Sequence, residues 1–225
     1  MPTTPFAPLG RGITPRPQAL SVDLYSLLIE MLLGPDCEPG ATLNIDRLAE
    51  AWDVSPTPVR ETLSQATTNG LVIRRQNYGF RVAPLLSPED YSALMDARDL
   101  IQPYCAQRAA TLATEAELDS FDRFQDAMER TPRDPTDSEY RVHFRADIGL
   151  HRGIVLAAHN RFVVQAFDNC NVHFFRFQRF RVGPVQDASD AHTEQRAIIA
   201  ALRNRDPLAA RKAMVDHVDA VRSRG

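Results

Sequence analysis

The sequence contains no long apolar run and no recognisable leader. None of its 225 residues lie in a stretch approaching the roughly 20 consecutive apolar residues of a membrane-spanning helix. The N-terminus also lacks a charged region followed by an apolar run and a cleavage site. These absences argue against a membrane span and a secretory signal, and we expect a cytoplasmic protein.

Cysteine and lysine are both scarce. The three cysteines, Cys37, Cys105 and Cys170, are far apart and form no CxxC pattern, so we expect reduced core thiols and neither a disulfide framework nor a zinc knuckle. Lys212 is the only lysine, and the net charge is −3. A chain with this charge cannot coat nucleic acid indiscriminately, so any DNA binding must come from a local patch.

The chain divides by composition into a tail and two folded parts. Residues 1–17 hold five prolines and no apolar period, and we expect a flexible tail. Residues 18–84 combine short helical patterns with two β-prone runs, whereas the chain from 89 to 225 shows helical periods and no strand signal. A linker over 85–88 separates them. The predicted fold class is therefore mainly α.

The first folded part predicts a helix-turn-helix followed by a hairpin. Leucines at helical spacing predict a first helix that ends at Gly34-Pro35, and Ile45 to Trp52 marks a second. Ser55-Pro56 opens a third helix, which Asn69-Gly70 ends. Two β-prone runs follow, Leu71–Ile73 and Phe80–Val82, joined by a turn that contains glycine. This order of elements is that of a winged helix-turn-helix.

The third helix and the hairpin carry groups suited to DNA. In a helix-turn-helix the second helix of the pair enters the major groove, and its N-terminal residues meet phosphates, so small hydroxyls and arginine are expected there. Arginines on the first hairpin strand would reach the DNA backbone or the minor groove. The candidate contacts are Ser55, Thr57, Arg60, Gln65, Arg74 and Arg75. A three-helix bundle with solvated charges is the alternative.

The motif over these residues resembles a known family. PGATLNIDRLAEAWDVSPTPVRETLSQATTNGLV (39–72) and NYGFRV (77–82) are similar to the DNA-binding domain of GntR regulators. The resemblance implies a homodimer on a two-fold operator, with Arg60 on the DNA and Gly79 in a wing that probes the minor groove. Pro56 stands where the family usually has arginine, so the resemblance implies a shifted base specificity.

The second part predicts helices near 88–113, 115–130, 137–159, 161–182, 189–204 and 207–223. Several polar residues fall on their apolar stripes, and a buried polar group needs a partner or a ligand. Four helices could thus direct polar atoms to one cavity, which would bind a small effector. The candidate residues are Arg98, Gln102, Asp147, His151, Gln195 and His217.

This part resembles the all-helical effector domain of the FadR subfamily. The similar segments are DARDLIQPYCAQRAA (96–110), DIGLHRGIVLAAHNRF (147–162) and EQRAIIAALRNRDPLAARKAMVDHV (194–218). In metal-binding members, the resemblance implies an Asp-x3-His pair and two further histidines. Asp147, His151 and His217 match three of these ligands, whereas Gln195 replaces the remaining histidine. A divalent ion such as zinc, nickel or manganese is one expectation, and a hydrogen-bonded Asp–His pair that binds the effector directly is the other.

Arg98 is a candidate anion site because an inward arginine must be paired. A bidentate carboxylate of the effector would satisfy it, and an ion pair with Asp147 is the alternative. We therefore predict a ligand-responsive transcription regulator, a repressor released by a small carboxylate, and no enzyme. A metal-dependent enzyme that uses Asp147, His151 and His217 is the competing hypothesis, although it leaves 39–82 unexplained.

Overall fold

The structure is a computed structural model that describes residues 18–33, 37–76, 79–132, 137–178 and 188–224. The chain forms two compact units, Met1–Val82 and Ala83–Gly225, each of which is described by itself. The predicted flexible tail lies outside the described residues, and so do the predicted end of the first helix at Gly34-Pro35 and the tip of the hairpin. The predicted fold class, mainly α with a small β-wing, is confirmed.

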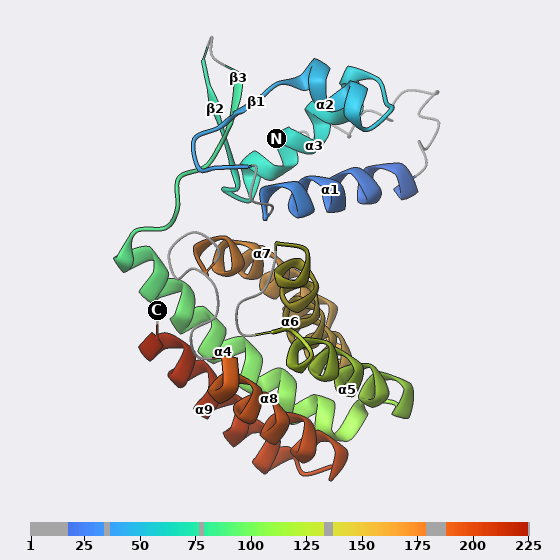
Figure 1. The fold of residues 1–225 in the computed structure, drawn as a ribbon, viewed down its shortest axis with the longest axis vertical. Coiled ribbons are helices and arrows are strands. Elements are labelled where there is room, and N and C mark those ends of the chain that lie inside the picture. The colour runs from blue at the N-terminus through green and yellow to red at the C-terminus, as the bar shows by residue number, and fades with distance from the viewer. Residues whose placement is uncertain (1–17, 34–36, 77–78, 133–136, 179–187, 225) are drawn as a thin grey trace, which may run out of the picture. The chain divides into compact units, whose positions relative to one another are not determined.

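The described residues of the N-terminal unit form three helices and a small antiparallel sheet (Figure 1). Its helices are α1 (Gln18–Leu32), α2 (Ile45–Ala51) and α3 (Pro56–Thr68). Its strands are β1 (Thr42–Leu43), β2 (Val72–Arg75) and β3 (Gly79–Val82), in the order β1-β3-β2. The hairpin follows the prediction, whereas β1 was not predicted.

The helices of this unit begin where the local chemistry favours them. The Asn44 side chain accepts a hydrogen bond of 3.0 Å from the backbone N–H of Arg47 and so caps α2. Pro56 occupies the first position of α3, where a missing N–H costs nothing. The α3 stripe of Val59, Leu63 and Ala66 is buried, as predicted.

One expectation for α1 is wrong in part. Leu24, Leu28 and Leu32 are buried, but Leu27, another of the leucines at helical spacing, is 43% exposed. The buried leucines are four residues apart and define one narrow stripe, and Leu27 is offset from it by one position. The inward face of α1 is therefore narrower than the sequence suggested.

All the regular secondary structure in the described residues of the C-terminal unit is helical (Figure 1). The helix α4 contacts α6, α7, α8 and α9, and α5 packs against α6 and α8. The predicted helices agree with the observed ones to within about two residues, except that the predicted end at 182 lies outside the described residues. The observed bounds are α4 (Pro88–Leu112), α5 (Glu115–Glu129), α6 (Asp137–Ala157), α7 (Arg161–Phe177), α8 (Ala188–Arg203) and α9 (Pro207–Arg224).

Two glycines allow α5 and α6 to approach closely. A Cβ atom on Gly149 would lie 2.6 Å from Cε1 of Phe124, and one on Gly153 would lie 2.9 Å from Cε1 of Phe121. Real Cβ atoms do not approach other atoms so closely, so a larger residue at either position would force the two helices apart. This pair of helices depends on the absence of a side chain at two points one turn apart.

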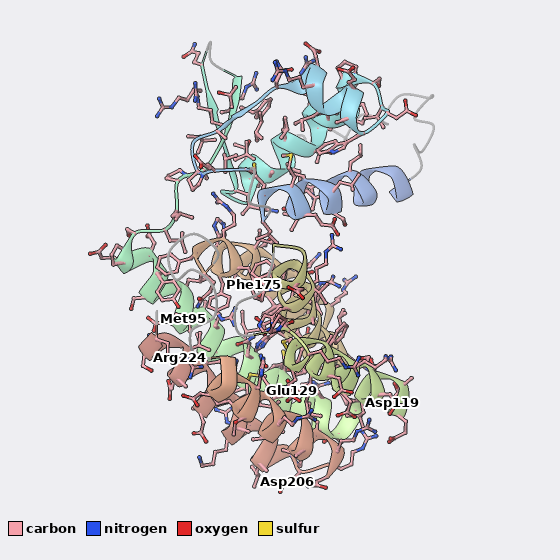
Figure 2. All side chains as sticks on the ribbon, viewed as in Figure 1. Met95, Asp119, Glu129, Phe175, Asp206 and Arg224 are labelled. Atoms are coloured by element: carbon pink, nitrogen blue, oxygen red, sulfur yellow. The ribbon has the colours of Figure 1, made fainter. Side chains whose placement is uncertain are left out.

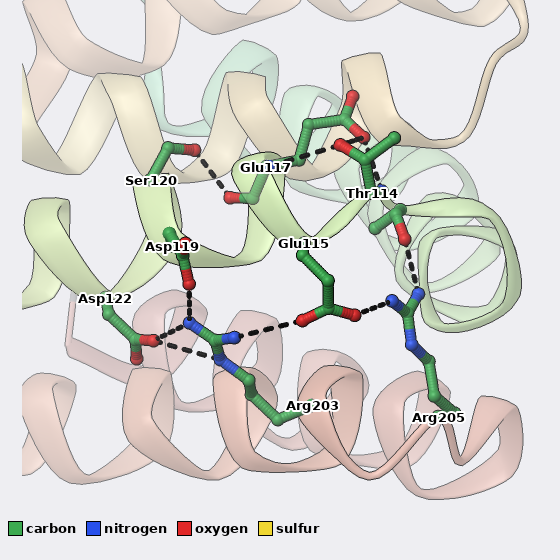
Figure 3. A network of polar contacts seen from close by, with 9 residues as sticks. Thr114, Glu115, Glu117, Asp119, Ser120, Asp122, Arg203 and Arg205 are labelled. Carbon is green, nitrogen blue, oxygen red and sulfur yellow. Dashed lines mark hydrogen bonds and ion pairs between the residues drawn. The ribbon is translucent and has the colours of Figure 1, made fainter.

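Ion pairs link α5 to the end of α8 and the residues that follow it (Figure 3). Arg203, on α8, donates to carboxylates of Asp119 and Asp122 and lies 3.5 Å from Glu115. Arg205 donates to Glu115 at 2.6 Å and to the carbonyl oxygen of Ala113. These contacts join the start of α5 to the end of α8, and most of the charged groups are solvated, so each adds little to stability alone.

Aromatic residues of α7 fill the interior of the unit. Phe175, labelled in Figure 2, is 1% exposed and meets Phe144 and Phe174 edge-on, with ring centroids 5.0 and 5.2 Å away. The neighbouring Arg176 is also buried, and its Nη2 donates to the carbonyl oxygen of Ala83 at 2.6 Å. The first residue of the C-terminal unit is thus held by α7.

The three cysteines are reduced thiols, with Cys37 and Cys105 buried and Cys170 partly so. Burial raises the pKa of the Cys105 thiol to about 12. No helix among the described residues has both the length and the apolar character that crossing a membrane would demand.

Candidate functional site

The N-terminal part of α3 and the β2–β3 hairpin form one concave, positively charged surface. A pocket of about 490 Å³ is lined by side chains of α2, α3, β2 and β3 and the turn between the strands. Phe80 forms its apolar floor, and the Arg74 guanidinium lies 5.7 Å from the centroid of that ring. The lining residues are Ile45, Arg60, Arg74, Arg75, Gln76, Gly79 and Phe80.

The structure brings four of the seven DNA candidates together at this pocket: Arg60, Arg74, Arg75 and Gly79. Gly79 adopts φ of +74°, a conformation that favours glycine, with no atom near its Cβ position. Ser55, Thr57 and Gln65 are exposed on α3 but do not line the pocket. Ser55 is the N-cap of α3, yet its hydroxyl makes no capping hydrogen bond.

The C-terminal unit gathers the second set of candidates in its core. Five of the six candidates are almost fully buried, and the Asp147 side chain is 22% exposed. They come from four helices: α4 supplies Arg98 and Gln102, α6 supplies Asp147 and His151, α8 supplies Gln195, and α9 supplies His217. We call these six residues the polar core.

Arg98 is held by α7 and not by a carboxylate. Its Nη1 donates to Oδ1 of Asn171 at 3.2 Å, and the guanidinium carbon lies 3.5 Å from the centroid of Phe174. Its Nε is buried without a hydrogen-bond partner. Burial lowers the pKa of Arg98 to about 10, although the charge of Asp147 opposes this change. The arginine stays protonated at neutral pH, and its Nε is an unused donor.

A chain of hydrogen bonds crosses the polar core from α9 to α4. Nδ1 of His217 lies 2.8 Å from a carboxylate oxygen of Glu194, and the Nε2 atoms of His217 and His151 are 3.3 Å apart. At the other end, Nδ1 of His151 lies 3.0 Å from Nε2 of Gln102. The two imidazole rings are nearly parallel, with centroids 5.1 Å apart.

The partners assign the protons along this chain when both rings are uncharged. A carboxylate only accepts, so Nδ1 of His217 donates to Glu194 and its Nε2 accepts. Nε2 of His151 must then donate to it, which leaves Nδ1 of His151 to accept from the Gln102 amide. Burial, with His217 and Arg98 nearby, lowers the pKa of His151 well below its ordinary value, so this ring is neutral.

Asp147 connects this chain to α8. Its Oδ1 accepts a hydrogen bond of 2.7 Å from Nε2 of Gln195 and lies 3.5 Å from Nε2 of His151. Gln195 therefore faces Asp147. The described residues contain no group of three or more His, Cys, Asp or Glu side chains that could hold a metal ion as it stands. Of the three metal candidates, His151 and His217 share a hydrogen bond, and Asp147 lies within 3.5 Å of Nε2 of His151.

Glu194 anchors the chain and was not among the sequence candidates. Burial alone would raise its pKa, but hydrogen bonds from Arg224 and His217 lower the pKa to about 2. Both carboxylate oxygens accept from Arg224, at 2.7 and 2.9 Å. A carboxylate that orients an imidazole is typical of sites in which the ring has a ligand-binding role.

Asn171 and Phe174, the neighbours of Arg98, were also missed. The only signal was a polar residue one turn before a cluster of phenylalanines on 161–177, and it does not identify a partner. Gln76 was missed in the N-terminal unit, although it lies in the turn next to Arg75. Side-chain partners across helices depend on packing, which periodicity does not encode.

Comparisons with known proteins match both units. Residues 20–82 match the family "Bacterial regulatory proteins, gntR family", and residues 93–220 match the FCD domain. The "HTH-type transcriptional regulator LutR" of Bacillus subtilis is 30% identical over 58% of this chain and 64% of its own length. The "Probable D-xylose utilization operon transcriptional repressor" of Paenarthrobacter nicotinovorans is 27% identical over 80% of this chain and 77% of its own. The solved structure of E. coli McbR/YncC has a TM-score of 0.73 at 17% identity, covering 90% of this chain and 94% of that one, and shows the same fold.

A gntR-type winged helix-turn-helix together with an FCD domain defines a DNA-binding transcription regulator of the ligand-responsive class, not an enzyme. The chain belongs to the gntR family of bacterial regulatory proteins, in the group that carries an FCD domain. As a member of this family it binds operator DNA and, through the FCD domain, a small-molecule effector. The competing hypothesis of a metal-dependent enzyme has no support from these relatives.

Proposed function

We propose that this regulator is a cytoplasmic homodimeric repressor that a small carboxylate releases from a two-fold operator. Arg60, Arg74, Arg75 and Gly79 would contact DNA through the concave surface, with Ser55, Thr57 and Gln65 as further contacts from α3. The polar core would bind the effector. An effector with different affinity for the DNA-competent and DNA-incompetent states would shift the balance between them.

The observation that carries the effector class is the state of Arg98. It is a buried cation whose hydrogen bond goes to a neutral amide, and its Nε has no partner. A buried charge is costly unless it is paired, and a carboxylate matches the planar guanidinium by two parallel hydrogen bonds. The nearest acid of the polar core, Asp147, bonds to Gln195 instead.

The experiment uses DNA selected from a random duplex library by the full-length protein. Fluorescence anisotropy of the selected duplex is measured with increasing amounts of small carboxylic acids, and the matching primary amides serve as uncharged controls. We expect at least one acid, and not its amide, to weaken DNA binding in the wild type. Release that is unaffected by Arg98→Met would contradict the effector site, and a monomer on the selected duplex, by native mass spectrometry, would contradict the dimer.

We also propose that the polar core can hold a divalent ion such as zinc, nickel or manganese through Asp147, His151 and His217. Neutral imidazole and carboxylate are suitable ligands, and His217 is oriented by Glu194 with its Nε2 free of a proton. The ion would supply a positive charge for the effector's carboxylate. His151 presents the opposite tautomer, so binding requires its proton to move to Nδ1 and the Gln102 amide to turn over. Direct effector binding by the hydrogen-bonded pair is the alternative.

Replacement of Gln195 tests the metal proposal. Imidazole is a much better zinc ligand than a carboxamide, so Gln195→His should tighten zinc binding when the four side chains converge. Calorimetric titration of chelator-stripped protein measures the change, and Gln165→His, at an exposed position of α7, is the matched control. Equal affinities, or no binding in either protein, would mean that the four side chains do not converge on a metal ion, and would leave the direct alternative.

A further inference from the structure

Two buried amide oxygens of the polar core have no hydrogen-bond partner: Oε1 of Gln102 and Oε1 of Gln195. For Gln195 the assignment is fixed by its neighbour. Asp147 can only accept, so the amide nitrogen must face it and the oxygen must point elsewhere. Buried polar atoms are nearly always paired in folded proteins, so each exception calls for an explanation.

The oxygen of Gln102 follows from the proton order described above. Glu194 accepts from His217, His217 accepts from His151, and His151 accepts from the Gln102 amide nitrogen. Because every bond in the chain is donated towards Glu194, the Gln102 amide nitrogen is the first donor. The Gln102 oxygen is left without a partner. Because the two glutamines bond to Asp147 and His151, which lie 3.5 Å apart, both oxygens belong to one cluster.

The helix that carries Gln102 also carries a buried donor without a partner, Nε of Arg98. Arg98 and Gln102 are one turn apart on the same face of α4, and both are 1% exposed. The Arg98 Nε and the two glutamine oxygens cannot satisfy one another in the described arrangement, since all three lack partners. A ligand that pairs them all must accept hydrogen bonds at one end and donate them at the other.

We infer that the effector is a small carboxylate that also carries a hydrogen-bond donor, a hydroxyl or an ammonium group, and that Gln102 and Gln195 select for this donor. The inference rests on the proposed function, in which Arg98 receives the carboxylate. A site built to accept a hydrogen bond discriminates strongly against an analogue without the donor, because the acceptor then stays buried and unpaired. The two glutamines are thus specificity-determining residues.

A third glutamine offers a matched control. Gln125, on α5, is fully buried and also has an Oε1 without a partner, but its amide nitrogen bonds to Glu129 and to the carbonyl oxygen of His192. It shares no hydrogen bond with Arg98, Asp147 or His151. Replacing Gln125 by methionine removes the same chemical group from a different part of the unit.

The test compares acids of equal chain length with the full-length protein by calorimetry. The sets are propionate, lactate and alanine; succinate, malate and aspartate; and hexanoate and gluconate. In at least one set we expect the member with a donor to bind roughly ten-fold more tightly than the unsubstituted acid. Comparison of lactate with alanine, and of malate with aspartate, distinguishes a hydroxyl donor from an ammonium donor.

The variants assign the preference to its residues. The ratio of interest is the affinity for the donor-bearing acid divided by that for the unsubstituted acid. Gln102→Met and Gln195→Met should lower this ratio towards one while the unsubstituted acid still binds. Gln125→Met should leave the ratio unchanged. Gln102→Met keeps the bond from Gln195 to Asp147, so it remains informative if Gln195→Met unfolds. Equal binding of all members in wild type, or a preference that survives both variants, would overturn the inference but not the carboxylate proposal. If no acid binds, both the inference and the carboxylate proposal are overturned. DNA binding is measured separately and does not depend on this result.

Discussion

The two units place their functional groups in opposite environments. In the N-terminal unit, Arg60, Arg74 and Arg75 are exposed and surround an open pocket, whereas in the C-terminal unit Arg98 is buried against Phe174. An exposed guanidinium can be removed without loss of a packing partner. A buried one is part of the core, so its removal changes ligand binding and internal hydrogen bonding together.

The largest expected effect is at Arg98. Arg98→Met should weaken binding of the carboxylate effector by roughly 100-fold, because a charge-assisted pair in a buried site is lost. Calorimetry with the best acid of the panel measures this, and DNA binding without effector should stay close to wild type. Arg108→Met, at an exposed position of the same helix, is the control. Equal losses in both variants would show that Arg98 has no special role.

A substitution at Arg60 tests the proposed DNA contact of the exposed arginines in the N-terminal unit. Arg60→Ala should weaken operator binding by about 1–3 kcal/mol if its guanidinium contacts a base, with the acid affinity unchanged. Anisotropy with the selected duplex gives the loss, and Arg211→Ala, an exposed arginine of α9, removes the same charge elsewhere. Unchanged DNA binding in Arg60→Ala would remove α3 from the proposed interface at that position.

A substitution at Gly149 tests whether the C-terminal unit can be destabilised without an effect on the N-terminal unit. Gly149→Ala should destabilise the C-terminal unit by about 1–2 kcal/mol, because the clash with Phe124 exceeds the gain in helix propensity. Trp52 is the only tryptophan and lies in the N-terminal unit, so its fluorescence follows that unit in denaturant while circular dichroism follows mainly the helices of the other. Gly153→Ala should cost less. A shift of the Trp52 transition alone would refute this account.

The smallest expected effect is a pH dependence from Glu194. Its pKa is lowered from 4.5 to about 2 in the folded protein, so its contacts stabilise the fold above the unfolded value and this contribution disappears as the pH falls towards 2. Glu194→Gln should therefore reduce the loss of unfolding free energy between about pH 5 and pH 2, by about 1 kcal/mol after solvent screening. Glu50→Gln, on the surface of α2, should not. Parallel profiles for wild type and Glu194→Gln would contradict the pKa assignment.

Sequence patterns predicted the elements well and the side-chain partners poorly. The signal at Ser55-Pro56 located α3, and the stripe shared by His151 and Ile154 located the inward face of α6, because both depend on local geometry. The strand β1 was missed since two residues carry no period. The bond from Arg98 to Asn171 and that from His217 to Glu194 join separate helices, and their partners depend on how those helices pack.

The hydrogen bond between Arg176 and the carbonyl oxygen of Ala83 bears on how the protein can be divided. By helix content the C-terminal unit begins at Pro88, and the sequence predicted a linker over 85–88. By its interactions it begins at Ala83, which is 5% exposed and accepts a hydrogen bond from a buried guanidinium. A fragment that starts at residue 88 would leave Arg176 without this acceptor, at a cost of about 1–3 kcal/mol. An isolated sensor fragment should therefore retain Ala83, the residue that directly follows the wing.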